Sequence, residues 1–131
     1  MRMPGAFGWI AASAALLAAC NSTPKPIIQD QRIVGTWRVT ANDAVVSFTE
    51  TGIYTMRVPD IDRPVVGSYD WDPDTATLTM QTRRESPICS DDVGVYHVRL
   101  SALTLDAEVQ RETCQVRKSL FARPLDRAPS R

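Results

Sequence analysis

The sequence predicts an all-β fold, a small eight-stranded antiparallel up-and-down barrel. From Ile33 onward, short runs rich in Val, Ile, Thr, Tyr and Trp alternate with turn-forming clusters, as expected of strands joined by hairpins. A helical period of apolar residues nowhere persists for about three turns, so we expect little helix. Antiparallel strands joined in order by short turns close most simply into a barrel, which removes exposed edges. A two-sheet sandwich is the alternative.

The expected strands recur about every 8 to 12 residues, a spacing typical of barrels and sandwiches. They cover 34–40, 44–49, 53–58, 65–71, 75–82, 93–100, 103–109 and 115–123. We therefore place the barrel domain at 33–123 and expect 124–131 to form a disordered C-terminal tail.

Turn chemistry and side-chain alternation support these strands. Gly52 ends the turn 49–52 at a position where a positive φ is needed, and Pro73 holds the second position of the turn 72–75. In the hairpin 93–109, apolar and polar residues alternate, so one face is expected to be buried and the other to be exposed to solvent. The residues expected on the buried face of its second strand are Leu103, Leu105, Ala107 and Val109.

Residues 1–19 have the features of a secretory signal peptide. Arg2 is their only charged residue, and an Ala- and Leu-rich run from Ala6 to Ala19 follows it. That run is shorter than the roughly 20 apolar residues that a helix needs to cross a bilayer core. We therefore expect this segment to be removed after export.

The run ends in Leu17-Ala18-Ala19-Cys20, which resembles the lipobox of bacterial lipoprotein precursors. The resemblance implies cleavage before Cys20, diacylglycerol on its thiol and usually a third acyl chain, for which we expect palmitate. Two or more acyl chains anchor a protein stably to a membrane. Asn21, in place of Asp, implies location in the outer membrane facing the periplasm. An ordinary signal peptide that happens to end near Cys20 is the alternative.

The segment that follows is expected to be a flexible tether, 20–32 including the lipidated cysteine. Its composition is polar, and Pro24 and Pro26 interrupt any regular structure. The chain has 15 basic and 15 acidic residues, a formal net charge of zero, and loss of Arg2 with the signal peptide leaves a charge of minus one. This balance gives no reason to expect a nucleic-acid partner.

Cys89 and Cys114 are predicted to form a disulfide. Lipidation consumes Cys20 and leaves these two cysteines as a pair, and export places them in an oxidising compartment. A hairpin centred on 101–102 pairs residues whose numbers sum to about 203, which is also the sum for the two cysteines. Two separate buried thiols are the alternative.

Val34-Gly35-Thr36-Trp37 is similar to the Gly-x-Trp opening of lipocalins. The order of several later segments is also similar to that in bacterial lipocalin-like lipoproteins. These segments are Phe48 to Tyr54, Gly67-Ser68-Tyr69, Leu78-Thr79-Met80, Cys89, Gly94-Val95-Tyr96, Leu103-Thr104-Leu105 and Cys114 to Arg117. The resemblance covers about 33–123, and it departs from classical lipocalins in its shorter length and its lack of an obvious C-terminal helix.

The lipocalin resemblance also implies a structural pair that closes the barrel. In lipocalins the opening Trp closes the bottom of the barrel, and a basic residue of the last strand packs over it. Trp37 is the matching residue here, Arg117 is the expected partner, and Arg123 is the second choice. A cation over an indole contributes about 0.5 to 2 kcal/mol. A ligand-stacking surface is the alternative interpretation of Trp37.

The chain offers no recognisable catalytic set, so we expect no enzymatic activity, no metal and no cofactor. His97 is its only histidine, and we expect it on a wet strand face without a Gly-x-Ser-x-Gly motif to accompany it. Asp70, Asp72 and Asp74 alternate like the start of a calcium loop, but the Gly and Glu that this loop requires are missing. Turn capping is therefore the expected role of these aspartates.

Two loops are candidates for recognition. The longest connection is 83–92, which is basic at one end and acidic at the other, and which the disulfide would hold against the barrel. Its charged residues are Arg83, Arg84, Glu85, Asp91 and Asp92. A second polar loop, 59–64, carries Asp60, Asp62 and Arg63. The alternatives are that 83–92 is a connection held by the disulfide for stability alone and that 59–64 is a solvated connection without a role in binding.

These features support two hypotheses about function. The first is a non-enzymatic, lipid-anchored lipocalin-like barrel of the cell envelope that binds a small apolar ligand. The second is a protein-binding module of the envelope, such as an inhibitor of a lysozyme or protease. An open apolar cavity would favour the first, and a filled barrel with an ordered protruding loop would favour the second. The residues expected to fill the barrel are Phe48, Tyr54, Met56, Tyr69, Leu78, Met80, Tyr96, Val98 and Leu100.

Overall fold

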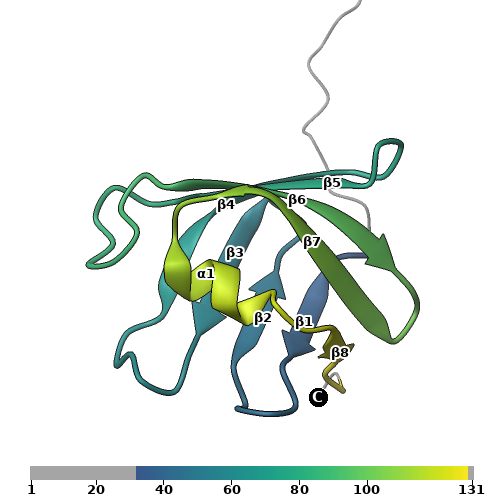
Figure 1. The fold of residues 1–131 in the computed structure, drawn as a ribbon, viewed down its shortest axis with the longest axis horizontal. Helices are drawn as coiled ribbons and strands as arrows, with labels where there is room; N and C mark the ends of the chain where they lie inside the picture. The colour runs from purple at the N-terminus through teal and green to yellow at the C-terminus, as the bar shows by residue number, and fades with distance from the viewer. Residues whose placement is uncertain (1–31, 130–131) are drawn as a thin grey trace, which may run out of the picture.

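The computed structural model describes residues 32–129, which form a closed barrel of eight antiparallel strands in sequence order (Figure 1). Each strand pairs with the next one along the chain, and the last strand pairs with the first. One short helix lies between the last two strands. The elements are β1 Gly35–Arg38, β2 Val45–Phe48, β3 Ile53–Arg57, β4 Val65–Asp72, β5 Thr77–Thr82, β6 Val93–Leu100, β7 Thr104–Glu112, α1 Gln115–Leu120 and β8 Leu125–Arg127.

The predicted eight-stranded barrel is confirmed. Seven of the eight expected strands are present, and their ends differ from the prediction by at most three residues. The period of two produces this agreement: in β4, Val65, Tyr69 and Trp71 point inward and are buried while Ser68 and Asp70 are exposed. Gly52 has the positive φ expected in its turn, 85°. Alternation and turn chemistry together therefore specify β1 to β7.

Side chains fill the interior of the barrel. Of the nine residues expected there, eight are buried, and only Leu100 is half-buried. The rings of Phe48 and Tyr69 meet edge to face with their centroids 4.8 Å apart. The rings of Tyr96 and Phe121 are also 4.8 Å apart and are tilted by 49° to each other. An eight-stranded barrel is just wide enough for its own side chains, and these buried side chains occupy the space between the strands.

The eighth expected strand, 115–123, is wrong, because this segment begins with helix α1. Cys114, Arg117, Leu120 and Phe121 are buried, which is the spacing of one helical face rather than of a strand. The helix is only six residues long, so its apolar period is too short to recognise in the sequence. The helix lies beside β7, and Leu120 and Phe121 pack into the hydrophobic core.

The C-terminal boundary is also wrong, because part of the expected tail is the strand that closes the barrel. In β8, Arg127 pairs with Trp37 of β1, and Leu125 pairs with Leu105 of β7. A strand of three residues that follows Pro124 carries too little alternation to be distinguished from a polar tail. The barrel domain thus extends through β8.

The buried face expected for β7 is only partly correct. Leu105 is buried, but Leu103 and Val109 are 70% and 40% exposed. The strand β8 pairs with β7 at two positions only, so no strand covers the second half of β7 on that side. Inward-pointing Val109 therefore remains partly accessible to solvent.

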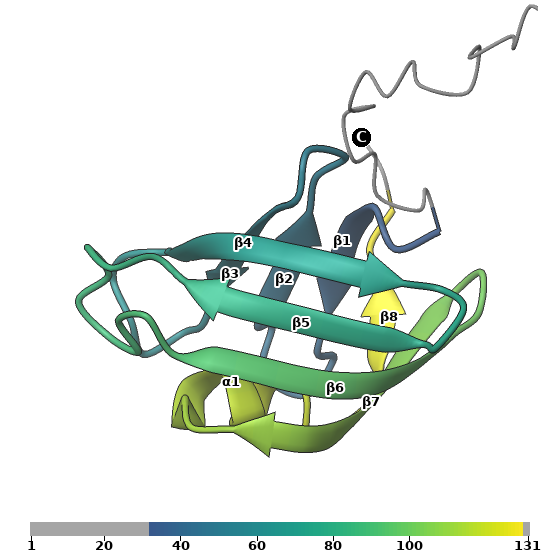
Figure 2. The ribbon, with the colours of Figure 1, turned by 90° about the horizontal axis from the view of Figure 1, so that it is seen from above.

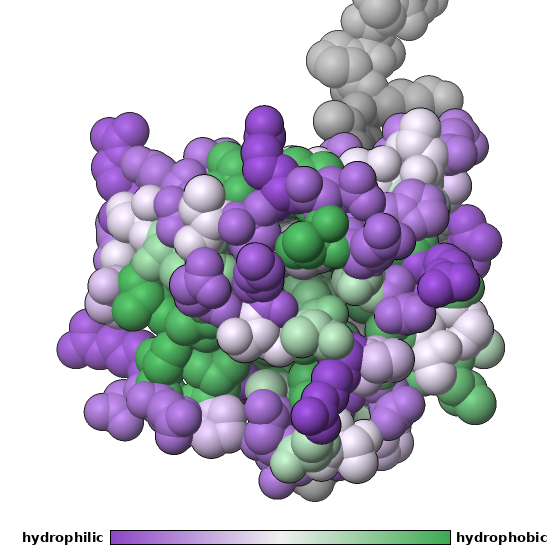
Figure 3. All heavy atoms as spheres, viewed as in Figure 1, coloured by the Kyte–Doolittle hydropathy of each residue, from purple (hydrophilic) through white to green (hydrophobic). Residues whose placement is uncertain are grey.

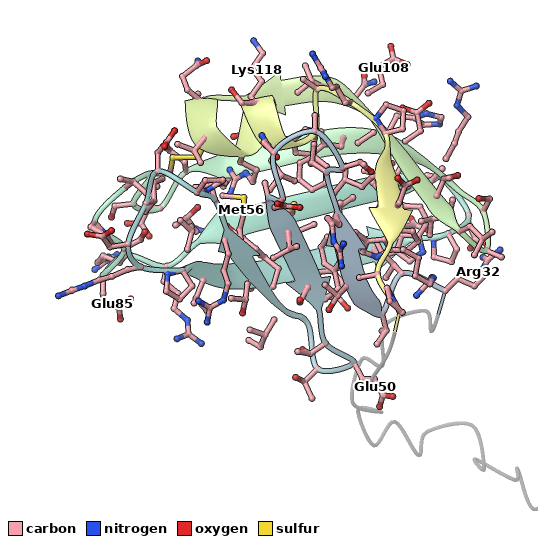
Figure 4. All side chains as sticks on the ribbon, turned by 90° about the horizontal axis from the view of Figure 1, so that it is seen from below. Arg32, Glu50, Met56, Glu85, Glu108 and Lys118 are labelled. Carbon is pink, nitrogen blue, oxygen red and sulfur yellow. A yellow bond between two sulfur atoms is a disulfide. The ribbon has the colours of Figure 1, made fainter. Side chains whose placement is uncertain are left out.

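The barrel has two distinct ends. The β3–β4 and β5–β6 connections lie together at one end, and the described chain enters at the other (Figure 2). The view in Figure 4 shows Arg32 and Glu85 at opposite ends of the molecule. We call the end that carries the two connections the loop end.

Candidate functional site

The predicted recognition loop, 83–92, has a defined local structure. The amide of Ser86 donates to the carbonyl of Arg83 over 3.1 Å, and the amide of Asp92 donates to the carbonyl of Cys89 over 3.0 Å. Each bond closes a tight turn within the loop. These two turns fold the β5–β6 connection into a compact, ordered shape.

The predicted disulfide is confirmed: Cys89 is bonded to Cys114, with their Cα atoms 5.2 Å apart. The bond joins the centre of the loop to the residue that precedes α1. The hairpin register used in the prediction was wrong, because Tyr96 pairs with Val109 rather than Ala107, and a bulge follows at Val95/Tyr96. The cysteines still meet because both lie beyond the paired part of the hairpin.

A buried arginine holds the two ends of this loop. Arg117 is fully buried, and its guanidinium group bonds to five oxygen atoms of four residues. Its partners are Glu112 Oε2 at 2.5 Å, Glu112 Oε1 at 2.8 Å, Tyr54 Oη at 2.9 Å, Thr82 Oγ1 at 2.9 Å and the Asp92 carbonyl at 3.0 Å. Thr82 immediately precedes the loop and Asp92 ends it. The Thr82 amide also donates to the Asp92 carbonyl over 3.1 Å.

Glu112 is the counterion of Arg117, and its side chain is fully buried. The Tyr96 hydroxyl donates to its Oε2, and the Cys114 amide donates to its Oε1 over 2.9 Å. Burial disfavours the carboxylate, but the hydrogen bonds from Arg117, Tyr96 and Cys114 outweigh burial and lower the pKa of Glu112. Burial and the bond to Glu112 raise the pKa of Tyr96 above its ordinary value. The carboxylate is therefore ionised and paired at neutral pH.

Sequence reasoning missed this network and gave Arg117 a different role. Arg127, and not Arg117 or Arg123, stacks on Trp37, with its guanidinium carbon 4.2 Å from the ring centroid. Arg127 belongs to β8, which the prediction had assigned to the tail, so the expected partner was sought in the wrong segment. Gly94 leaves room for this network, since a Cβ atom there would lie 2.1 Å from Glu112 Oε2.

The Trp37–Arg127 pair lies where the chain enters the barrel. Arg127 donates to the backbone carbonyls of Ala102, Val34 and Arg32, over 2.9, 3.1 and 2.6 Å. The indole Nε1 of Trp37 donates to the Ile33 carbonyl over 3.0 Å. This pair closes the barrel and fixes the start of the domain. The contacts of Trp37 are therefore those of a structural residue.

The two loops predicted for recognition meet at the loop end. A surface cleft of about 400 Å³ lies between 83–92 and the β3–β4 connection, 58–64. Its lining residues are Arg63, Pro64, Val66, Arg83, Glu85, Ser86 and Pro87. We call it the arginine cleft. The predicted residues Arg84 and Asp91 lie outside the lining and form an exposed ion pair at 3.3 Å.

A second hollow lies on the other side of the β3–β4 connection. It has a volume of about 290 Å³ and is formed by α1, the β1–β2 turn and the start of 58–64. Its lining residues are Asn42, Ala44, Val58, Pro59, Asp60, Ile61, Gln115, Val116, Ser119 and Leu120. We call it the helix groove. The space-filling view shows an apolar patch between α1 and this connection (Figure 3).

The remaining candidate residues lie apart from the loop end or have local roles. His97 is exposed on β6, as expected for a wet strand face. Asp72 Oδ1 accepts a hydrogen bond from the Asp74 amide over 3.0 Å, which confirms turn capping. Within 32–129, no three His, Cys, Asp or Glu side chains form a group that could hold a metal ion.

The membrane-related predictions concern the N-terminal segment. The signal peptide 1–19, Cys20 and the tether, except for Arg32, lie outside the described residues. In the part of the chain that is described, no helix is long and apolar enough to cross a membrane.

Comparisons with known proteins do not identify a family. A scan against family models finds no match, a search of curated proteins finds none, and a search of solved structures finds none.

Proposed function

We propose that this protein is a non-enzymatic lipoprotein of the bacterial cell envelope whose barrel is a rigid support for a protein-binding surface at the loop end. The observation that carries the proposal is the fixation of loop 83–92. Arg117 bonds to both ends of the loop, and the disulfide holds its centre. A loop that is already ordered loses little conformational entropy on binding, which favours affinity for a protein partner.

The filled barrel supports this hypothesis over the carriage of a small apolar ligand. Carriers of the barrel type enclose their ligand in a cavity lined by apolar side chains. Here Tyr54, Met56, Leu78, Met80 and Tyr96 occupy that space and are fully buried. The arginine cleft and the helix groove are lined largely by the connections 58–64 and 83–92 and by α1. An envelope inhibitor of a lysozyme or protease is one class of protein that fits this arrangement.

The position of the chain entry supports a consistent orientation. Arg32 and Glu85 lie at opposite ends of the barrel (Figure 4). If lipid on Cys20 holds the chain at the outer membrane, the domain is joined to its anchor through the end that carries Arg32, and the loop end is the end remote from that attachment. A partner in the periplasm would then reach the arginine cleft and the helix groove without obstruction by the membrane.

Lipidation can be tested by metabolic labelling of the full chain with an alkyne analogue of palmitate in a Gram-negative host. We expect label on the wild-type protein and fractionation with the outer membrane. The variant Cys20→Ala should carry no label and keep its signal peptide. Label that persists in Cys20→Ala, or an unlabelled soluble wild type, would contradict the anchor.

Protein binding can be tested with a photoreactive amino acid at Glu85, which lies in the arginine cleft. Glu50, an exposed residue of the β2–β3 turn, is the matched control position. In cells that carry the natural envelope, we expect a defined protein adduct from position 85 and none from position 50. The adduct should weaken in Cys89→Ala/Cys114→Ala, which frees the loop. Equal adducts at both positions, or none at 85, would refute a partner at the loop end.

A further inference from the structure

The β3–β4 connection stands between two hollows of different chemistry. Its later residues, Arg63 and Pro64, line the arginine cleft, and its earlier residues, Val58 to Ile61, line the helix groove. The amide of Ile61 donates to the Val58 carbonyl over 3.2 Å, so the ridge between the hollows contains a closed turn. One bound segment that crosses this ridge would contact both hollows.

The arginine cleft has an excess of positive charge. Two guanidinium groups, of Arg63 and Arg83, line it with one carboxylate, that of Glu85. Both arginines are exposed, and neither has an ion-pair partner within the described part of the chain. Pro64, Val66 and Pro87 add apolar walls. An arginine fork pairs best with a carboxylate or phosphate oxygen, so the cleft is complementary to an acidic group.

The helix groove has an apolar centre and a polar rim. Ala44 and Leu120 at its base are buried, and Val58, Ile61 and Val116 are half-buried. Exposed Asn42, Asp60, Gln115 and Ser119 surround them. An apolar centre inside a polar rim is the anatomy of a protein interface, where one large side chain of the partner enters a pocket.

We propose that the partner contributes a single protein segment that crosses the β3–β4 connection, with an acidic side chain in the arginine cleft and a large apolar side chain in the helix groove. The proposal rests on the proposed function and specifies the chemistry of the partner. Charge complementarity to the arginine cleft favours the acidic residue of the partner. The apolar base of the helix groove favours its large apolar residue. The two hollows share one ridge, which makes a single segment sufficient.

The test uses the mature lipidated protein in lipid nanodiscs and a phage-displayed library of random linear peptides. We expect the enriched peptides to combine Asp or Glu with a large aliphatic or aromatic residue a few positions away. Ser119→Trp fills the helix groove from an exposed position, and Lys118→Trp is the control on the same helix, because Lys118 is exposed and does not line the groove. We expect Ser119→Trp to weaken the selected peptides at least about tenfold, and the control to leave them unchanged.

Charge reversal tests the arginine cleft. Arg63→Glu and Arg83→Glu should each weaken the same peptides about twofold to fivefold at low salt, and the difference should disappear near 1 M salt. Arg123→Glu is the charge-matched control, because Arg123 is exposed and lines neither hollow. Circular dichroism of each variant confirms that the barrel is intact.

Three outcomes would overturn the proposal: peptides without the acidic and apolar combination, binding that survives Ser119→Trp, or equal losses in the variants and their controls. Each leaves the proposed function intact if the photoreactive residue at position 85 still captures a protein. Loss of that adduct instead removes the proposed function itself, so the two failures are distinguishable.

Discussion

Removal of Arg117 is expected to be among the most destabilising single substitutions in the barrel. Arg117→Met deletes five hydrogen bonds and leaves the Glu112 carboxylate buried without a cation. Breaking a buried pair from one side costs about 3 to 5 kcal/mol. Small domains have a free energy of unfolding of about 5 to 15 kcal/mol, so this loss is a large share of the total.

Urea unfolding of exported residues 21–131, followed by tryptophan fluorescence, measures this loss. The control is Arg99→Met, which breaks the exposed pair of Arg99 with Asp106 and should cost less than about 1 kcal/mol. The double variant Arg117→Met/Glu112→Leu should regain much of the stability, because an apolar pair replaces the buried charges. A loss below about 1 kcal/mol for Arg117→Met, or a double variant less stable than the single one, would refute the reasoning.

The remaining predictions concern pH, the disulfide, the closing pair and one tyrosine. Because the folded-state pKa of Glu112 lies below its ordinary 4.5, the stabilisation by its carboxylate should be complete above about pH 4.5 and be lost as pH falls through the folded-state pKa. The free energy of unfolding of Glu112→Gln should therefore change less between neutral and acid pH than that of the wild type. Cys89→Ala/Cys114→Ala should lower the unfolding free energy by about 3.5 kcal/mol, measured in urea, whereas an unchanged midpoint would contradict a stabilising bridge. Arg127→Met should lower the free energy of unfolding by about 1 to 2 kcal/mol and change the fluorescence of Trp37, whereas the control Arg123→Met should change neither. Burial and nearby Glu50 raise the pKa of Tyr69 to about 12, so absorbance titration should lose a late phenolate step in Tyr69→Phe.

The strands were predictable because each carries its own pattern. In β4 and β6, inward and outward residues alternate over eight positions, and this local property does not depend on distant contacts. The disulfide was also predictable from the count of cysteines and the expected export. Both predictions need only local sequence and composition.

The last part of the chain was less predictable, because its structure depends on long-range packing. The helix α1 and the strand β8 are six and three residues long, too short for a period to emerge. The predicted partner of Trp37 was Arg117, and the observed partner is Arg127, because the strand β8 that carries Arg127 was not recognised. Arg117 instead bonds to Tyr54, Thr82 and Asp92, residues far away in the sequence, whose proximity only the closed barrel creates.

The candidate site was predictable as two loops but not as one surface. Polar composition and length identified 59–64 and 83–92 separately. Their meeting in the arginine cleft follows from the pairing of β4 with both β3 and β5, which brings the two connections to the same end. The helix groove required α1, which the sequence did not predict.

The central claim is that a filled barrel acts through its outer surface, and native mass spectrometry of the exported protein tests it most directly. The protein is purified without detergent as residues 21–131, beside a reduced and alkylated control. We predict a chain that is lighter by the two hydrogens of one disulfide and carries no small molecule under gentle ionisation. An apolar molecule that travels with the folded protein and is released only on denaturation would contradict the account.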